Sequence, residues 1–312
     1  MSTKSDTTFF HLMEKGKFSD CRFKVGSETF DCHKIILASV SDYFDRLFLE
    51  ESTKVTSKIY SLVDVKPDTF KNFLKYAYTR NEKDICNYSN AMIMELFECG
   101  SKWLVKSMTN ICSKHLKIHC DSMPFGDMLK MFEFSHRMDN LELINASKEV
   151  MTKRFAKSLN CFEALHLTPK VFEKYVLATS EVLPEVERFK MIQAYLDVNG
   201  LKFDKSNQSS LKESKDKNNE TNDTENEDYD LFVLPEAPKL FPPTLIIGEM
   251  EKCHLEPPNS DFVHKLLSYI NYKLMCSQDF YEVVGKSDLL TFQEKFENLY
   301  LTIKSSDNED DK

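Results

Sequence analysis

Hydrophobic and polar residues alternate strictly over two short stretches near the start of the chain. Residues 21–25 read Cys-Arg-Phe-Lys-Val and residues 28–32 read Glu-Thr-Phe-Asp-Cys, with Gly26 and Ser27 between them. A period of two is the pattern of a half-buried β-strand, and a two-residue connection containing glycine is typical of a tight hairpin. The sequence therefore predicts a β-hairpin here.

The period of the apolar residues becomes helical directly after this hairpin. Apolar residues at positions 35–38 and then at 43, 44, 47 and 48 follow the spacing of a helix face, which predicts two helices. Ser39 or Ser41 offers a side-chain oxygen to cap the second of them. The β-branched segment 59–65 predicts another strand, and Pro67 suits the first turn of a further helix.

From residue 89 onward the apolar pattern is helical throughout. A helix pair is predicted over 89–119, with Cys112 and His115 on the apolar face of its second member. Further helical blocks are predicted at 128–134, 141–155, 161–165, 171–177 and 186–198. Pro169 and Pro184 lie between blocks, as expected between antiparallel helices.

A polar stretch interrupts this helical part. Residues 202–228 contain only Phe203 and Leu211 as large apolar residues, so we expect disorder because too little apolar area is available for burial. Serines and threonines among its acids leave open a phosphorylated docking segment. Eight acidic and three basic residues lie between 212 and 230, and the tail 305–312 is also acidic, so most of the net charge of −9 lies outside the expected folded body.

Apolar patterns return after the polar stretch. An extended segment is predicted at 241–245, because two prolines follow Phe241. Phe262, Leu266, Ile270 and Leu274 then recur at a spacing of four, which predicts a helix. Thr291 and Glu294 have the spacing of a capping box, before a last helix that carries Phe292, Phe296, Leu299 and Ile303.

Several short motifs follow one another in a fixed order in the first part of the chain. They are Ser19-Asp20, His33-Lys34, Leu37-Ala38-Ser39 and Ser41-Asp42-Tyr43-Phe44, followed later by Tyr76-Ala77-Tyr78-Thr79. This order resembles the BTB/POZ domain family over residues 9–119. The family usually has a glycine after the last motif, where this chain has Arg80. The resemblance implies an α+β domain, a small sheet with helical hairpins, over 1–120.

The later helical blocks resemble the BACK domain that commonly follows a BTB domain. The residues that carry this resemblance are Phe155, Phe162, Leu165 and the segment 187–196, followed by 270–275 and 287–290. It implies an all-α helical array in two parts, over 121–201 and 231–304. The polar stretch 202–230 is then an insertion within the array, and 305–312 is an acidic tail.

The resemblance implies a homodimer and suggests where its interface lies. Candidate interface residues are those of an N-terminal apolar helix and of a charged pocket: Phe9, Phe10, Leu12, Met13, Asp20, His33 and Lys34. Two alternatives remain open from the residues themselves. The helix can cover the core of its own domain, and Asp20 and His33 can satisfy local backbone groups at the ends of the hairpin.

A second interaction surface is implied just past the Tyr-Phe helix. Many BTB adaptors that bind cullin-3 carry a hydrophobic-x-Glu triplet there, and Leu49 and Glu51 match it in type. Tyr43 and Phe48 complete the candidate cullin surface. An apolar anchor beside a carboxylate suits a partner groove, although ordinary loop composition also explains three residues.

Little in the chain points to catalysis, metal binding or a cofactor. Its nine cysteines and eight histidines form no CxxC pair or nucleophile elbow, and its seven glycines never cluster into a phosphate-binding loop. Cys112, His115, His119 and Cys120 have metal-ligand side chains, but we expect a packed helix end because the set is too compressed for a tetrahedral site. We therefore predict no enzyme, no metal site and no cofactor.

Composition also restricts the partners. The folded body is close to neutral, so it offers no basic patch for nucleic acid or an anionic membrane, and no apolar run approaches the length of a membrane span. Scattered cysteines and a polar start predict a reduced protein in the cytoplasm, the nucleus or both.

Two functions remain in view. The first is a BTB homodimer that brings an unknown substrate protein to a cullin-3 ubiquitin ligase. The second is a scaffold in transcription or the cytoskeleton that uses the same dimer without a ligase. We find neither Kelch repeats nor zinc fingers that would identify the substrate.

Overall fold

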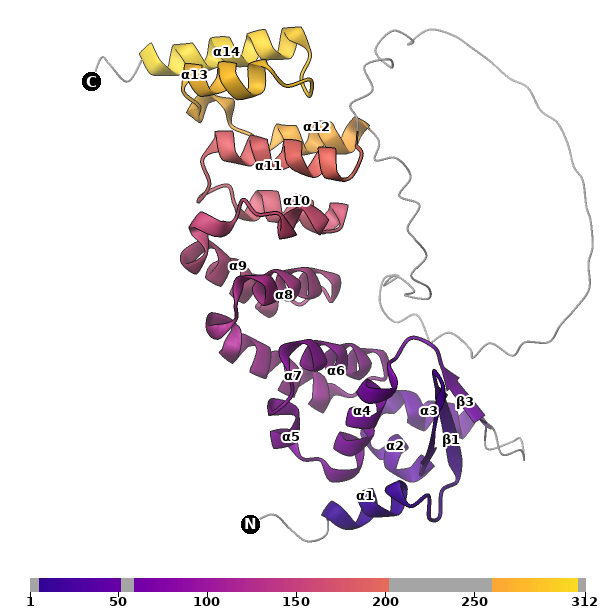
Figure 1. Ribbon diagram of the computed structural model, residues 1–312. Helices are drawn as coiled ribbons and strands as arrows, with labels where there is room; N and C mark the ends of the chain where they lie inside the picture. The colour runs from indigo at the N-terminus through magenta and orange to yellow at the C-terminus, as the bar shows by residue number, and fades with distance from the viewer. Residues whose placement is uncertain (1–5, 52–58, 202–259, 308–312) are drawn as a thin grey trace, which may run out of the picture.

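The computed structural model describes residues 6–51, 59–201 and 260–307 (Figure 1). The N-terminal part combines a small sheet with helices, and the rest is a stack of helices that extends away from it. Helices α1 and α14 lie at opposite ends of the molecule. The expectations for 202–230 and 241–245, and for the acidic tail beyond residue 307, lie outside the described residues. No helix in the described part of the chain is long and apolar enough to cross a bilayer.

Three strands form the sheet, in the order β2-β1-β3. Strands β1 (Cys21–Val25) and β2 (Glu28–Cys32) are antiparallel, while β3 (Ile59–Leu62) runs parallel to β1. The predicted hairpin is therefore present. Gly26 has a φ of 58° in its turn, a conformation that favours glycine. The strand predicted over 59–65 is shorter than expected.

Within residues 6–51 and 59–119, seven helices accompany the sheet. They are α1 (Asp6–Glu14), α2 (Lys34–Val40), α3 (Asp42–Glu51), α4 (Pro67–Thr79), α5 (Glu82–Cys86), α6 (Asn90–Lys102) and α7 (Lys106–His119). Of the two serines considered as caps, Ser41 caps α3: its Oγ accepts a hydrogen bond from the backbone N–H of Phe44 at 3.0 Å and donates to the carbonyl of Trp103 at 2.6 Å. This serine thus joins α3 to the end of α6.

Aromatic side chains fill the space between the sheet and these helices. Phe23 on β1 lies 5.5 Å from the ring of Phe44 and 5.5 Å from that of Phe70. The ring of Trp103 lies 4.6 Å from Phe73 and 5.5 Å from Phe44. Since all five side chains are almost fully buried, they hold the strands, α3 and α4 together as one aromatic core.

Arg80, where the related family usually has a glycine, takes up the conformation that a glycine would. Its φ of 53° is left-handed, and its N–H donates to the carbonyl of Tyr76 to end α4. The guanidinium donates hydrogen bonds to the carbonyl and the hydroxyl of Ser39 at 3.1 Å. The strain of the left-handed backbone is thus offset by side-chain contacts that a glycine lacks.

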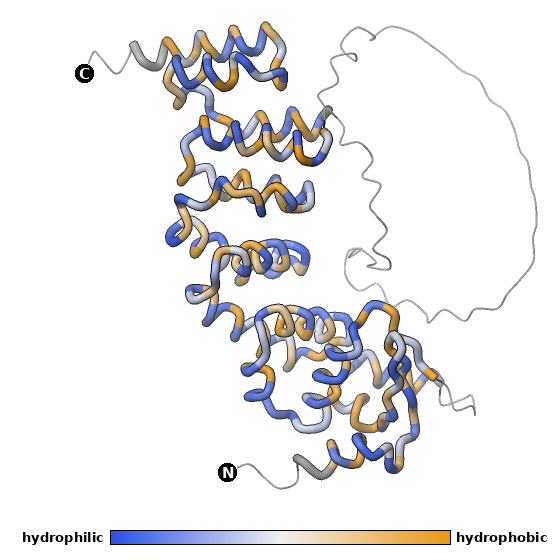
Figure 2. The backbone as a smooth tube through the Cα atoms, viewed as in Figure 1, coloured by the Kyte–Doolittle hydropathy of each residue, from blue (hydrophilic) through white to orange (hydrophobic). Residues whose placement is uncertain are grey.

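The helical array consists of layers stacked on the N-terminal part (Figure 1). Its helices are α8 (Phe125–Arg137), α9 (Leu141–Arg154), α10 (Pro169–Ala178), α11 (Glu185–Val198), α12 (Ser260–Ser268), α13 (Ser277–Asp279) and α14 (Phe292–Asp307). Short 3₁₀ helices precede or connect them: η1 (Cys120–Ser122), η2 (Ala156–Ser158), η3 (Glu163–His166) and η5 (Tyr272–Leu274). The π-helix η6 (Phe280–Gly285) follows α13. Figure 2 shows apolar and polar residues mixed along each helix, as amphipathic packing requires.

Residues before and after the stretch 202–259 pack against each other. Lys265 forms an ion pair with Glu173 at 3.0 Å, and the hydroxyl of Tyr269 donates to the same carboxylate at 2.9 Å. The carboxylate of Glu185, which is paired with Arg188 at 2.7 Å, also accepts the backbone N–H of Asn271 at 3.2 Å. Helices α10, α11 and α12 therefore belong to one array, held across the stretch by partly buried polar contacts as well as by apolar packing.

The helix predicted over 262–274 is wrong in its extent, because α12 ends at Ser268. The N–H of Asn271 bonds to Glu185 instead of to a carbonyl of its own helix, and Tyr272 turns into the core, where it is 8% exposed. Leu274, expected on the buried face, is 72% exposed. The contact with Glu185 on α11 thus ends the helix earlier than the spacing of its apolar residues predicts.

The last helix begins as predicted but packs through a narrower face than its apolar residues suggest. The N–H of Thr291 donates to the carboxylate of Glu294 at 2.7 Å, and the N–H of Glu294 donates to the Thr291 hydroxyl at 3.2 Å, which is a capping box. Of the predicted apolar residues, Leu299 packs against the core. Phe292, Phe296 and Ile303 are exposed.

Candidate protein-interaction surfaces

The candidate cullin surface lies at the C-terminal end of α3. We placed Leu49 and Glu51 in a loop after the helix, but α3 continues to Glu51, so both residues lie in its last turns. Leu49 is 63% exposed. The side chain of Glu51 lies outside the described residues. The end of α3 thus presents a large apolar side chain to solvent.

The other two candidates on α3 are less accessible. Phe48 is 8% exposed and packs against Tyr60 on β3 with 5.7 Å between ring centroids, while the ammonium of Lys34 lies 5.5 Å from its ring. Tyr43 is half-buried against Phe44, and this burial raises the pKa of its hydroxyl. Phe48 therefore fixes α3 to the sheet and has little surface of its own for a partner.

The N-terminal helix has one side toward its own domain and one toward solvent. Helix α1 lies against α4 and β2. Phe10 and Met13 pack against the core, and Leu12 is partly buried. Phe9 is 53% exposed. The helix thus covers its own core and still offers an aromatic side chain on the outer side.

His33 joins three segments of the N-terminal part. Its backbone N–H donates to the hydroxyl oxygen of Tyr78 at 2.9 Å, and its Nδ1 lies 2.8 Å from the same oxygen. Its Nε2 lies 2.8 Å from the carbonyl of Lys17. In the neutral imidazole, these partners fit a Tyr78 hydroxyl that donates to Nδ1 and an Nε2–H that donates to the carbonyl.

Asp20 and Lys34 are connected in the same region. The carboxylate of Asp20 accepts the backbone N–H of Lys34 at 2.7 Å, at the start of α2. The polar candidates of the predicted dimer interface are thus engaged inside one protomer. Sequence reasoning missed Tyr78, whose hydroxyl contacts His33. The Tyr-x-Tyr-Thr motif drew attention to Tyr78 itself. It gave no sign of a contact with His33, which lies 45 residues away.

Most of the described cysteines lie in the core, whereas the described histidines are partly or fully exposed. Burial raises the pKa of the Cys21 and Cys112 thiols to about 12, so neither is a thiolate at neutral pH. The rings of His115 and His119 lie 4.3 Å apart on α7, while Cys112 and Cys120 are buried. Within the described ranges, no three histidine, cysteine, aspartate or glutamate side chains are grouped to hold a metal ion.

Comparison with known proteins identifies the N-terminal part. Residues 9–119 match the BTB/POZ domain family. Kelch-like protein 41 of the mouse is 25% identical over 159 residues, which are 51% of this chain and 25% of the relative. Human Kelch repeat and BTB domain-containing protein 8 is 28% identical over 158 residues, again half of this chain and a quarter of the relative.

A longer alignment reaches into the helical array. Kelch-like protein 40 of Xenopus laevis is 23% identical over 258 residues, which are 82% of this chain and 37% of the relative. Among solved structures, the BTB domain of zebrafish PATZ1 is 26% identical, with a TM-score of 0.31 and coverage of 36% of this chain and 87% of that chain. The chain spans between a quarter and two fifths of the length of these curated relatives.

These findings fix the class of the N-terminal part. Residues 9–119 are a BTB/POZ domain, as the order of motifs predicted, and a helical array follows it. The alignments to the curated relatives are longer than this domain, and the names of these relatives contain Kelch, whereas no Kelch repeat is recognisable in the sequence of this chain.

Proposed function

We propose that this protein is a non-enzymatic adaptor that forms a homodimer through its BTB/POZ domain and recruits substrate proteins to a cullin-3 ubiquitin ligase. The observation that carries the proposal is the position of Leu49, 63% exposed at the end of α3 in the BTB/POZ domain. The similarity to Kelch-like proteins supports an adaptor role.

The physical role of Leu49 follows from its surroundings. Burying a leucine side chain contributes about 1.5–3 kcal/mol to binding, and a fixed anchor keeps most of this gain because little side-chain entropy is lost. Phe48 and Lys34 hold the end of α3 against the sheet. In the proposed complex, Leu49 inserts into an apolar groove of cullin-3, and Glu51 orients the partner by its charge.

The proposed dimer uses the outer side of α1. Phe9 supplies apolar area there, and the contacts of His33 and Asp20 keep the neighbouring backbone rigid. A symmetric dimer presents two copies of each binding surface, so it increases the capture of substrates by avidity. We place the protein in the cytoplasm, the nucleus or both, where its thiols stay reduced.

Replacing Leu49 by aspartate tests the ligase role. We expect the purified Leu49→Asp variant to lose at least tenfold in affinity for cullin-3 in a pull-down titration, while size-exclusion chromatography still shows a dimer. Leu141→Asp is the matched control, because Leu141 is 70% exposed on α9, remote from α3. A wild-type dimer that binds no cullin-3 would refute the ligase role and leave the scaffold function.

A further inference from the structure

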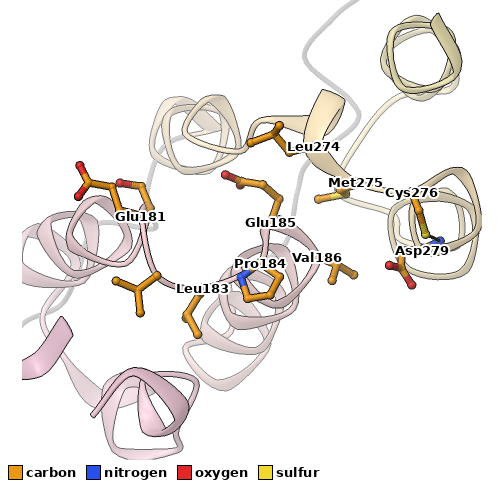
Figure 3. Close-up of a pocket in the computed structure, with 11 residues that line it drawn as sticks. Glu181, Leu183, Pro184, Glu185, Val186, Leu274, Met275, Cys276 and Asp279 are labelled. Atoms are coloured by element: carbon orange, nitrogen blue, oxygen red, sulfur yellow. Dashed lines mark hydrogen bonds between the residues drawn. The ribbon is translucent and has the colours of Figure 1, made fainter. Parts of the chain in front are cut away.

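A pocket of about 270 Å³ lies where the two parts of the helical array meet. One wall is the connection between α10 and α11, and the other is the segment from η5 to α13 (Figure 3). These walls come from either side of the stretch 202–259, so the pocket exists only when both parts are docked. The lining residues are Ser180, Glu181, Val182, Leu183, Pro184, Glu185, Val186, Leu274, Met275, Cys276 and Asp279.

Glu185 anchors the middle of this pocket. Its two carboxylate oxygens accept hydrogen bonds at 2.7 and 2.8 Å from one guanidinium nitrogen of Arg188, Nη1, and one of them also accepts the backbone N–H of Asn271 beside the opposite wall. The side chains of Glu185 and Arg188 are 7% and 1% exposed. A second guanidinium nitrogen of Arg188 donates to the carbonyl of Val176 on α10. The two walls are therefore held in a fixed relation before anything binds.

The charge of the lining has one sign. Three of the eleven lining residues are acidic and none is basic. Figure 3 shows Glu181 and Asp279 on opposite sides of the pocket, with Glu185 between them. Both outer acids are exposed. Arg188 pairs with Glu185, and Lys190 on α11 interacts electrostatically with Asp279, so the attraction for an incoming cation comes from Glu181 and from an Asp279 that is partly balanced.

Apolar side chains lie between the outer acids. Leu274, which leaves the core because α12 ends early, is 72% exposed and lines this pocket, and the chain from Leu183 to Val186 forms the other wall (Figure 3). The volume of about 270 Å³ is below the roughly 300–1,000 Å³ of most small-molecule sites. It suits one or two side chains of a peptide better than a cofactor.

We propose that this pocket binds an extended segment of a partner protein in which basic side chains flank an apolar one. The apolar side chain contacts the exposed Leu274, and the two basic side chains pair with Glu181 and Asp279. Opposite charge on either side of an apolar contact selects such a segment and rejects an acidic one. This binding does not involve cullin-3, so it and the ligase role can fail independently.

The test uses the full-length chain and an array of fluorescein-labelled peptides. Each peptide has a leucine between two arginines, and the separation of the arginines is varied. We expect at least one separation to bind measurably by fluorescence anisotropy, at least tenfold tighter than the same peptide with glutamate for arginine. Because the attraction is between exposed charges, raising the salt concentration should weaken it.

Reversing the charges of the two outer acids tests whether the peptide binds in this pocket. The double variant Glu181→Lys, Asp279→Lys should lose at least tenfold in affinity for the best peptide. The control Glu142→Lys, Glu149→Lys changes net charge equally on the exposed face of α9 and should bind like the wild type; circular dichroism checks that all variants are folded. Absence of binding for every separation, or equal loss in both double variants, would overturn the proposal.

Discussion

The BTB/POZ domain and the helical array are held together in different ways. In the BTB/POZ domain, a single tryptophan gathers three phenylalanines from α3 and α4 around it, and Ser41 links its backbone to α3. In the array, the junction across the stretch 202–259 depends on a buried carboxylate and a buried guanidinium. Apolar cores tolerate small shifts of their helices, whereas a buried ion pair demands exact geometry and fixes how helices meet.

Trp103→Ala should have the largest effect, because it removes the centre of the aromatic core. Trp103 is 1% exposed, and truncations of this kind cost about 3–5 kcal/mol. We expect the free energy of unfolding, measured by urea titration with circular dichroism, to fall by that amount. Phe292→Ala is the control: Phe292 is 86% exposed on α14, so its loss should stay within about 0.5 kcal/mol. Similar losses for both would contradict the assigned core.

Arg188→Met should have the next largest effect, and it separates the two regions. It leaves the Glu185 carboxylate buried without its partner, which costs about 3 kcal/mol. We expect unfolding by circular dichroism to shift more than unfolding by the fluorescence of Trp103, the only tryptophan of the chain, which reports on the BTB/POZ domain.

The double variant Glu185→Leu, Arg188→Met sharpens this comparison. Replacing both partners removes the unpaired charge, and Nε of Arg188 already lacks a hydrogen-bond partner within the described residues. We therefore expect most of the lost stability to return. A double variant no more stable than Arg188→Met would contradict this expectation, because it would show that the unpaired Glu185 carboxylate costs little.

Glu173 should give the smallest effect, and one that depends on pH. Burial alone raises the pKa of its carboxyl, but hydrogen bonds from Lys265 and Tyr269 outweigh burial and hold the pKa below its usual value. A lowered pKa in the folded state stabilises the protein above the pKa of the unfolded chain, about 4.3, and this contribution is lost as the pH falls below it.

We expect Glu173→Gln to destabilise the protein by about 1 kcal/mol at pH 7, because a partly exposed ion pair contributes little more. The difference from the wild type, measured by thermal unfolding between pH 7 and pH 3, should shrink at the acidic end. A difference that grows as the pH falls would have the wrong sign for this account.

The two regions also differ in how far their structures follow from the sequence. The hairpin, a serine cap at residue 39 or 41 and the helix that begins at Pro67 were predicted because alternation, capping and proline signals act within a few residues. The same holds for the capping box at Thr291. Such local signals also carried the match to the BTB/POZ family.

Longer-range contacts were not predicted. Helix α12 ends where the N–H of Asn271 bonds to Glu185, which lies 86 residues earlier in the chain. The apolar pattern at 262–274 gives no sign of this end. The sequence could not show which apolar residues of α14 pack inward, as the partly buried Leu299 does, and which stay exposed, as Phe292 does. Leu49 and Glu51 were placed just past the helix because its apolar pattern ends at Phe48, although a helix can continue through an exposed polar turn.

The most direct test of the central claim is calorimetric titration of the full-length protein with the N-terminal domain of cullin-3. The account predicts saturable binding of one cullin-3 per protomer, two per dimer, and an affinity at least tenfold weaker for Leu49→Asp with unchanged dimerisation. Wild-type protein that dimerises but shows no binding, or a Leu49→Asp variant that binds with unchanged affinity, would contradict it.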